Sequence, residues 1–305
     1  MMPMAANDAV AALPRYERPV EQLAADVHAD ADLIPWDRVP AAVAASSLSP
    51  GSKALLLGLL RTGTARVFAG GGAGIEYGSL LKTAARPDII GAHVREAASH
   101  LRTADADLLL VPGMSGYPIG SMYALAAELP AILLKKMSLS AAEAAACPPG
   151  AFVIPSYTGE GDVVMSADPL AVADIVDEAC GRQLAAQTDR SRLELVLHCA
   201  GADDIIDKAT MSQAVGESAV VIGRTAMGDW LTRHRAGTGD DRPAEIRVET
   251  VAWATPLIKG YNRPQELLQR WFGIAPFAGI NVVGLRLDPP ALDVEGVGLV
   301  AFRLG

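Results

Sequence analysis

Cysteines, basic runs and long apolar runs are scarce or absent in this sequence. Its 305 residues include three cysteines, none of which shares a Cys-x-x-Cys spacing, and this odd number argues against a disulfide framework. Zinc is not expected either, because the five histidines do not pair at ligand spacing. The formal net charge is -9 and no Lys/Arg run occurs, which argues against nucleic acid or an anionic membrane as a partner. No apolar run approaches the roughly 18 residues that would span a bilayer.

The composition that is present is typical of a globular chain. Half of the residues are hydrophobic and 20% are charged, which indicates a folded protein, and a chain of 305 residues can bury a sizeable core. The first residues lack a basic region followed by an apolar core, so no signal peptide is predicted. We therefore expect a cytoplasmic protein.

Apolar runs that end at Pro or Gly alternate with amphipathic segments along the middle of the chain. The continuous run at 107–113, which ends at Pro and Gly, is typical of a strand buried on both faces of a parallel sheet. Helical spacing of apolar residues predicts the helices between them. The predicted strands are 107–113, 131–136 and 193–200, the predicted helices lie within 79–105 and over 120–130 and 168–189, and a hairpin is predicted over 152–168. This alternation predicts an α/β fold.

The last third of the chain is predicted to be mostly strands. Val and Ile runs bounded by Gly and Pro indicate strands at 218–223, 246–254, 280–288 and 296–304. A helix is predicted near 228–235, between the first two of these strands.

Two adjacent carboxylates follow the apolar run at 193–200. These are Asp203 and Asp204, with a third acid at Asp207 and a threonine at Thr210. Two acids at the carboxyl end of a strand can accept hydrogen bonds from ribose hydroxyls or hold Mg²⁺ through water, and a helix start behind them can bind a phosphate. The alternative is that the three acids occupy the first turn of a helix, where acids are favoured in any case.

Two glycine-containing stretches are further candidates for anion binding. In the first, Gly72, Gly74 and Gly78 are spaced one residue too far apart for the dinucleotide-binding pattern, and no acid-ended strand follows about 20 residues later, which favours a tight connection. In the second, a buried strand ends at Gly113 and a helix is expected to begin around 119–121. The loop between them is predicted to be either an anion site or an ordinary strand-to-helix turn.

Taken in order, these segments resemble the type I phosphoribosyltransferases, and the adenine-type members are the most similar. The similarity covers roughly residues 74–215, with an insertion around 169–192. An early Gly-Ile-x-Phe segment, a Leu-Leu pair and a Pro-led helix of that family are matched by Gly74, Ile75, Tyr77, Leu80, Leu81 and Pro87.

The resemblance implies three loops around one substrate: a pyrophosphate loop at 113–120, a mobile catalytic loop at 156–161 and a diphosphate-sugar loop at 203–210. The implied substrate-binding residues are Gly113, Met114, Ser115, Gly116, Lys135, Lys136, Ser156, Asp207, Lys208, Ala209 and Thr210. The implied catalytic residues are Asp203, Asp204 and Tyr157, and the two aspartates are also implied to hold Mg²⁺.

The diphosphate-sugar loop departs from the family pattern. Lys208 and Ala209 stand where the family has Thr-Gly, and the loop is one residue short. In the family, small residues at this place wrap the 5-phosphate in backbone N–H groups, so a lysine would supply charge in their place. The helix after Thr210 is expected to be short, because the strand at 218–223 comes soon after it. A rival loop lies in 220–231, with Gly228 and Asp229, but lacks the acid pair.

The resemblance implies transfer of ribose 5-phosphate from phosphoribosyl diphosphate to a nitrogen of a heterocyclic base, with release of pyrophosphate. It implies Mg²⁺ as cofactor and a homodimer, as is frequent in the family. One alternative is a regulator on the same fold that binds phosphoribosyl diphosphate or a nucleotide without turnover. A more distant alternative is a doubly wound enzyme that binds a dinucleotide at 70–78.

The implied fold is α/β, with a phosphoribosyltransferase-like core whose mainly parallel sheet is flanked by helices. We expect three parts in the chain. These are an N-terminal helical or hood segment over 1–52, the α/β core over 53–255 and a C-terminal extension over 256–305 packed on the core.

Overall fold

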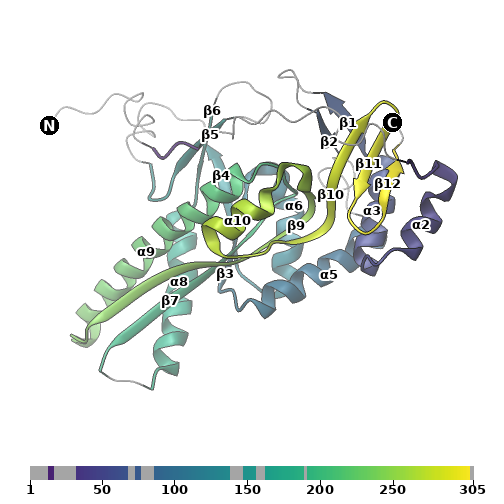
Figure 1. Ribbon diagram of the computed structural model, residues 1–305. Coiled ribbons are helices and arrows are strands. Elements are labelled where there is room, and N and C mark those ends of the chain that lie inside the picture. Colours follow the sequence, from purple (N-terminus) through teal and green to yellow (C-terminus); the bar gives the residue numbers. More distant parts are fainter. Residues whose placement is uncertain are drawn as a thin grey trace.

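The computed structural model describes residues 13–16, 32–67, 73–76, 86–137, 147–155, 162–188 and 191–302 (Figure 1). Its centre is a ten-stranded sheet with the order β12-β11-β10-β9-β7-β3-β4-β6-β5, in which β8 pairs with β9. The strands are β3 (Leu108–Pro112), β4 (Ala131–Met137), β5 (Phe152–Pro155), β6 (Asp162–Ser166), β7 (Leu193–Ala202), β8 (Ile205–Ile206), β9 (Ala244–Lys259), β10 (Phe277–Leu287), β11 (Pro290–Val294) and β12 (Gly298–Ala301). A separate antiparallel pair is formed by β1 (Thr64–Val67) and β2 (Ala73–Glu76).

The five central strands of the sheet, β4, β3, β7, β9 and β10, are parallel, and both edges of the sheet are antiparallel. The predicted α/β fold with a mainly parallel sheet is therefore confirmed. The hairpin predicted over 152–168 is also confirmed, as β5 and β6.

Helices cover both faces of the sheet, because side chains along each strand alternate between two cores. In β3, Leu109 and Val111 belong to the first core, whereas Leu108 and Leu110 belong to the second. The first core is covered by α2 (Val39–Ala45), α3 (Pro50–Thr62), α5 (Pro87–Thr103) and α6 (Gly113–Ala127), and the second by α8 (Pro169–Ala186), α9 (Thr210–Thr238) and α10 (Pro264–Phe272). Two 3₁₀ turns, η1 (Trp36–Arg38) and η2 (Gly260–Asn262), complete the described elements.

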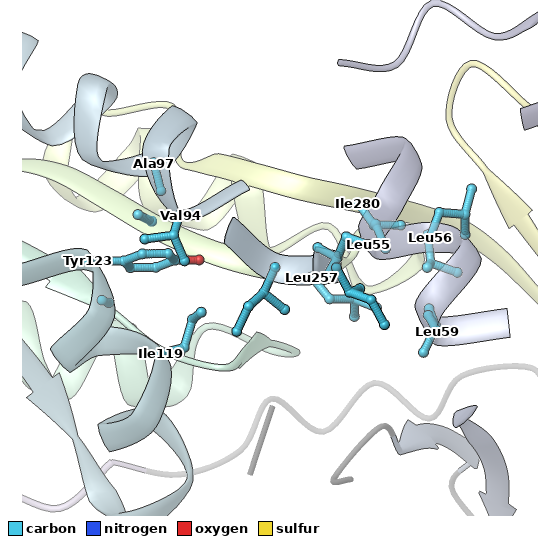
Figure 2. Close-up of a cluster of buried hydrophobic side chains, with 14 of the residues drawn as sticks. Leu55, Leu56, Leu59, Val94, Ala97, Ile119, Tyr123, Leu257 and Ile280 are labelled. Carbon is cyan, nitrogen blue, oxygen red and sulfur yellow. The ribbon is translucent and has the colours of Figure 1, made fainter. Parts of the chain in front are cut away.

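Figure 2 shows how the first core joins three helices to the sheet. Leu257 of β9 and Ile280 of β10 lie among side chains of α3, α5 and α6, and all of these residues are buried. The helical side chains labelled there are Leu55, Leu56, Leu59, Val94, Ala97, Ile119 and Tyr123.

The predicted strand at 218–223 is wrong, because this segment lies inside α9. A single helix of 29 residues covers it together with the predicted helix at 228–235 and the rival loop at Gly228 and Asp229. The short Val-Ile run favours a strand locally. However, the buried residues of α9 continue at helical spacing through this run, from Val215 to Trp230. Burial of this helical face outweighs the local preference of the run for a strand. The helix after Thr210 is therefore long.

The C-terminal part of the chain extends the sheet. The predicted strand at 246–254 is longer at both ends, as β9, and β10 and β12 overlap the strands predicted at 280–288 and 296–304. The sequence did not predict α10 and β11. The boundary at 52/53 falls within α3 and that at 255/256 falls within β9. None of the helices in the described ranges is both long enough and apolar enough to cross a membrane.

Candidate active site

A pocket of about 460 Å³ lies at the carboxyl ends of β3 and β7. These strands are parallel neighbours, but β3 leads through α6 to β4 on one side and β7 leads through α9 to β9 on the other. Where connections leave a parallel sheet in opposite directions, a crevice opens that commonly binds ligands. The lining is Gly113, Met114, Ser115, Lys136, Ile154, Pro155, Val163, Met165, residues 203–212 and Lys259.

One side of the pocket is the first turn of α6, which begins at Gly113 directly after β3. The helix start predicted around 119–121 is therefore wrong: Gly113 turns the chain from strand to helix with φ +54, and Pro118 lies inside the helix. A Cβ at Gly120 would lie 2.5 Å from Cγ1 of Val111, so glycine there lets α6 pack against β3. The first amides of α6 lack intrahelical acceptors and remain available to an anion.

The acid pair lies opposite this helix start, immediately after β7. Asp203 and Asp204 are 8% and 5% exposed. The N–H of Asp204 donates to Oδ1 of Asp203 over 2.8 Å. A Cβ at Gly116 would lie 3.1 Å from the same Oδ1, so the acid pair and the start of α6 are in close contact. The two loops that the sequence singled out separately therefore border one pocket.

The third acid, Asp207, is held by two side chains that the sequence did not identify. Nζ of Lys259, at the end of β9, lies 2.9 Å from Oδ2 of Asp207, and Nδ2 of Asn262 donates to Oδ1. The Lys259 side chain is 1% exposed and borders the pocket. The sequence contains one signal that could have identified Lys259, namely a lysine at the end of an apolar strand directly before Gly260. Because the carboxyl ends of parallel strands meet at one edge of the sheet, such a lysine is expected to lie near the acid pair.

The loop 203–210 makes a left-handed turn although it contains no glycine. Ala209 has φ +57 and is 3% exposed, and it is the N-cap of α9 without a side-chain capping hydrogen bond. Non-glycine residues in this conformation are sparse and concentrate at functional sites. Next to it, Oγ1 of Thr210 is buried and has no hydrogen-bond partner among the described residues. Lys208 also lines the pocket.

Only one lysine of the predicted basic pair borders the pocket. Successive residues of a strand point to opposite faces, and Lys136 of β4 lines the pocket whereas Lys135 does not. Nζ of Lys135 lies 3.2 Å from Oδ2 of Asp168, which also caps α8. Ser156 and Tyr157 lie outside the described residues. The hairpin on either side of them contributes an apolar part of the lining, with Ile154, Pro155, Val163 and Met165.

The pocket combines donors for anions with acceptors for hydroxyls. The starts of α6 and α9 both border it, and Lys136 and Lys208 add positive charge, whereas the charge of Lys259 is paired with that of Asp207. Within the described ranges, no group of three or more His, Cys, Asp or Glu side chains is arranged to hold a metal ion. The pair Asp203 and Asp204 fits Mg²⁺, which commonly uses one or two carboxylates together with phosphates of the substrate.

No family model matches this sequence, and no curated protein matches it. Among solved structures, the chain is similar to adenine phosphoribosyltransferases from Giardia lamblia (12% identity, TM-score 0.46, 76% of this chain and 98% of that chain) and from Rhodothermus marinus (10%, 0.46, 76% and 99%). It is also similar to an orotate phosphoribosyltransferase from Aeropyrum pernix (11%, 0.35, 76% and 93%). These solved structures are phosphoribosyltransferases, the family that the sequence resembles.

Proposed function

We propose that this protein transfers ribose 5-phosphate from phosphoribosyl diphosphate to a nitrogen of a heterocyclic base and releases pyrophosphate. One observation carries the proposal: a single pocket joins two buried carboxylates, two helix starts and the two lysines Lys136 and Lys208. This combination suits phosphoribosyl diphosphate, which carries two vicinal ribose hydroxyls together with a phosphate at one end and a diphosphate at the other.

In this reaction the bond from C1 of the ribose to the pyrophosphate oxygen breaks, a bond from C1 to the base nitrogen forms, and the proton on that nitrogen passes to the released pyrophosphate or to water. Positive charge builds on the ribose while the leaving group gains negative charge. We assign the ribose hydroxyls to Asp203 and Asp204, and the pyrophosphate to the first amides of α6 and Lys136. The 5-phosphate is assigned to the first amides of α9, with Lys208 and Thr210. Charge stabilisation of this kind by fixed donors is commonly the largest catalytic contribution.

Asp203 and Asp204 would hold Mg²⁺, and the ion would neutralise part of the charge on the phosphates. Gly116 supports this arrangement through its small size, because a side chain there would press on Oδ1 of Asp203. We assign water exclusion to the segment between β5 and β6, in which Ser156 and Tyr157 are the proposed contacts with the substrate. A homodimer remains part of the proposal.

The second candidate function is a regulator that binds the same ligand without turnover. The loop itself favours it, since Lys208 and Ala209 replace the pair that wraps the 5-phosphate in the resembling family. Binding and turnover therefore have to be measured separately.

The test is a calorimetric titration of the full chain with phosphoribosyl diphosphate, with and without Mg²⁺, followed by a pyrophosphate-release screen over heterocyclic bases. Mg²⁺-dependent binding with release supports the enzyme, and binding without release for any base supports the regulator. Absence of binding under both conditions would overturn both. Asp204→Asn is expected to weaken binding at least about tenfold, because a charged acceptor is lost. Asp174→Asn, exposed on α8, is the control and should bind normally.

A further inference from the structure

The loop between β7 and α9 is attached to β9 at three consecutive positions. Ile205 and Ile206 pair in parallel with Leu257 and Ile258, and the next residue, Asp207, meets Lys259 through its side chain. The loop is therefore joined to β9 by backbone pairing first and then by an ion pair. Lys259 lies 52 residues further along the sequence, so this attachment comes from the C-terminal part of the sheet.

Both carboxylate oxygens of Asp207 are engaged. Oδ2 accepts from Lys259 and Oδ1 accepts from Asn262, which belongs to the turn η2 directly after β9. We call Asp207, Lys259 and Asn262 the Asp207 clamp. A carboxylate with a donor on each oxygen has a fixed orientation, and the near-complete burial of Lys259 limits the freedom of the pair further.

The clamp lies directly before a strained turn of the backbone. Two residues after Asp207, Ala209 adopts a left-handed backbone conformation, which is energetically unfavourable for alanine. In addition, no side chain caps the N-terminus of α9. The start of α9 is thus fixed neither by a glycine nor by a capping residue. The first amides of α9 nevertheless border the pocket, and the Asp207 clamp is the adjacent group of contacts that holds the loop.

We propose that Lys259 and Asn262 are positioning residues for the diphosphate-sugar loop. They hold Asp207, and through it they keep residues 208–212 in the conformation that presents the start of α9 to a sugar phosphate. The clamp replaces the conformational role of the Thr-Gly pair that this loop lacks. The identity of the ligand in this proposal rests on the proposed function, whereas the effect of the clamp on the loop does not.

The first measurement is hydrogen exchange on the full chain without ligand, for the wild type, Lys259→Met and Asn262→Ala. We expect amides in 205–213 to exchange at least tenfold faster in both variants, with little change in β3 and α6. Lys53→Met is the matched control, because Lys53 lies on α3 and contacts a backbone carbonyl oxygen of α2. Unchanged exchange in 205–213 would overturn the proposal. If Lys259→Met does not fold, Asn262→Ala alone decides.

The second measurement separates positioning from a general loss of structure. Ribose 5-phosphate and inorganic pyrophosphate are titrated separately, because the first should depend on the loop 203–212 and the second on α6 and Lys136. We expect Lys259→Met to raise the Kd of ribose 5-phosphate at least tenfold and to leave that of pyrophosphate unchanged. Equal weakening of both ligands would overturn the positioning role. If the wild type binds neither these two ligands nor phosphoribosyl diphosphate, the proposed function fails, and the exchange measurement still decides on the clamp.

Discussion

Replacing Ala209 with glycine should leave the stability of the protein nearly unchanged, although most alanine-to-glycine changes at buried positions destabilise. Ala209 is 3% exposed and has φ +57 at the start of α9. Ala219 is the matched comparison, since it is also 3% exposed but lies inside α9. The two substitutions remove the same methyl group from equally buried sites and differ in the backbone conformation that the glycine inherits.

The expected magnitudes come from that difference. Glycine at 209 relieves a left-handed conformation that costs an L-residue about 1–2 kcal/mol. Against this stand the loss of a buried methyl group, about 0.8 kcal/mol, and the greater freedom of glycine in the unfolded chain, about 0.4–1 kcal/mol. The net change in the free energy of unfolding is near zero. Ala219→Gly loses the methyl group and about 1 kcal/mol of helix propensity, so it should destabilise by about 2 kcal/mol.

Urea unfolding followed by tryptophan fluorescence measures both variants, since the chain has four tryptophans. We expect the midpoint of Ala219→Gly to fall clearly while that of Ala209→Gly stays near the wild type, with the same slope in all three proteins. An equal fall in both midpoints would refute the reasoning, because it would mean that residue 209 has an ordinary backbone conformation in solution.

Three further predictions concern the core and the pocket. Gly201→Ala should destabilise the protein by about 3 kcal/mol in the same urea assay, because its Cβ would lie 2.2 Å from the ring of Trp253. Gly228→Ala, which faces open space in α9, should instead stabilise it by about 1 kcal/mol. An equal change in stability for both variants would contradict the close packing of Gly201 against Trp253. Burial lowers the pKa of His93 from 6.5 to about 4, so the folded state disfavours its protonation. Stability that is present above pH 6.5 should therefore fall by about 3 kcal/mol towards pH 4, and His93→Gln should remove this part of the pH dependence; an unchanged profile would exclude His93 as its cause. Lys208→Ala should weaken binding of ribose 5-phosphate and reduce its salt dependence, and unaltered titrations at two salt concentrations would make Lys208 a surface residue.

Several elements could be predicted from the sequence because a local pattern specifies them. The strand β3 is a continuous apolar run that is buried at all five positions, as expected for a strand buried on both faces of a parallel sheet, and apolar runs also mark β4 and β7. Helix α8 begins with Asp168 as its cap, followed by a proline. The acid pair at 203–204 could be identified as a candidate site for the same reason, since it directly follows a predicted strand.

Other features failed because local signals pointed the wrong way. The Val-Ile run at 218–223 fits a strand by composition, but its burial against β7 and β9 follows helical spacing; a Cβ at Gly223 would lie 2.9 Å from both Leu197 and Val248. Glycine and proline in 113–120 indicated a loop, yet they lie in α6 because Gly113 makes the turn and Gly120 packs against β3.

The spacing of apolar residues along the sequence is enough to predict the alternation of strands and helices. The acid pair at the end of β7 could also be predicted, because two charged residues directly follow an apolar run. The folded chain was needed to show that α6 and the acid pair share one pocket, that Lys136 and not Lys135 borders it, and that Lys259 and Asn262 hold Asp207. These contacts join residues that are tens of positions apart in the sequence. The local spacing of apolar residues does not specify which strand ends become neighbours, because that depends on the order of the strands in the folded sheet.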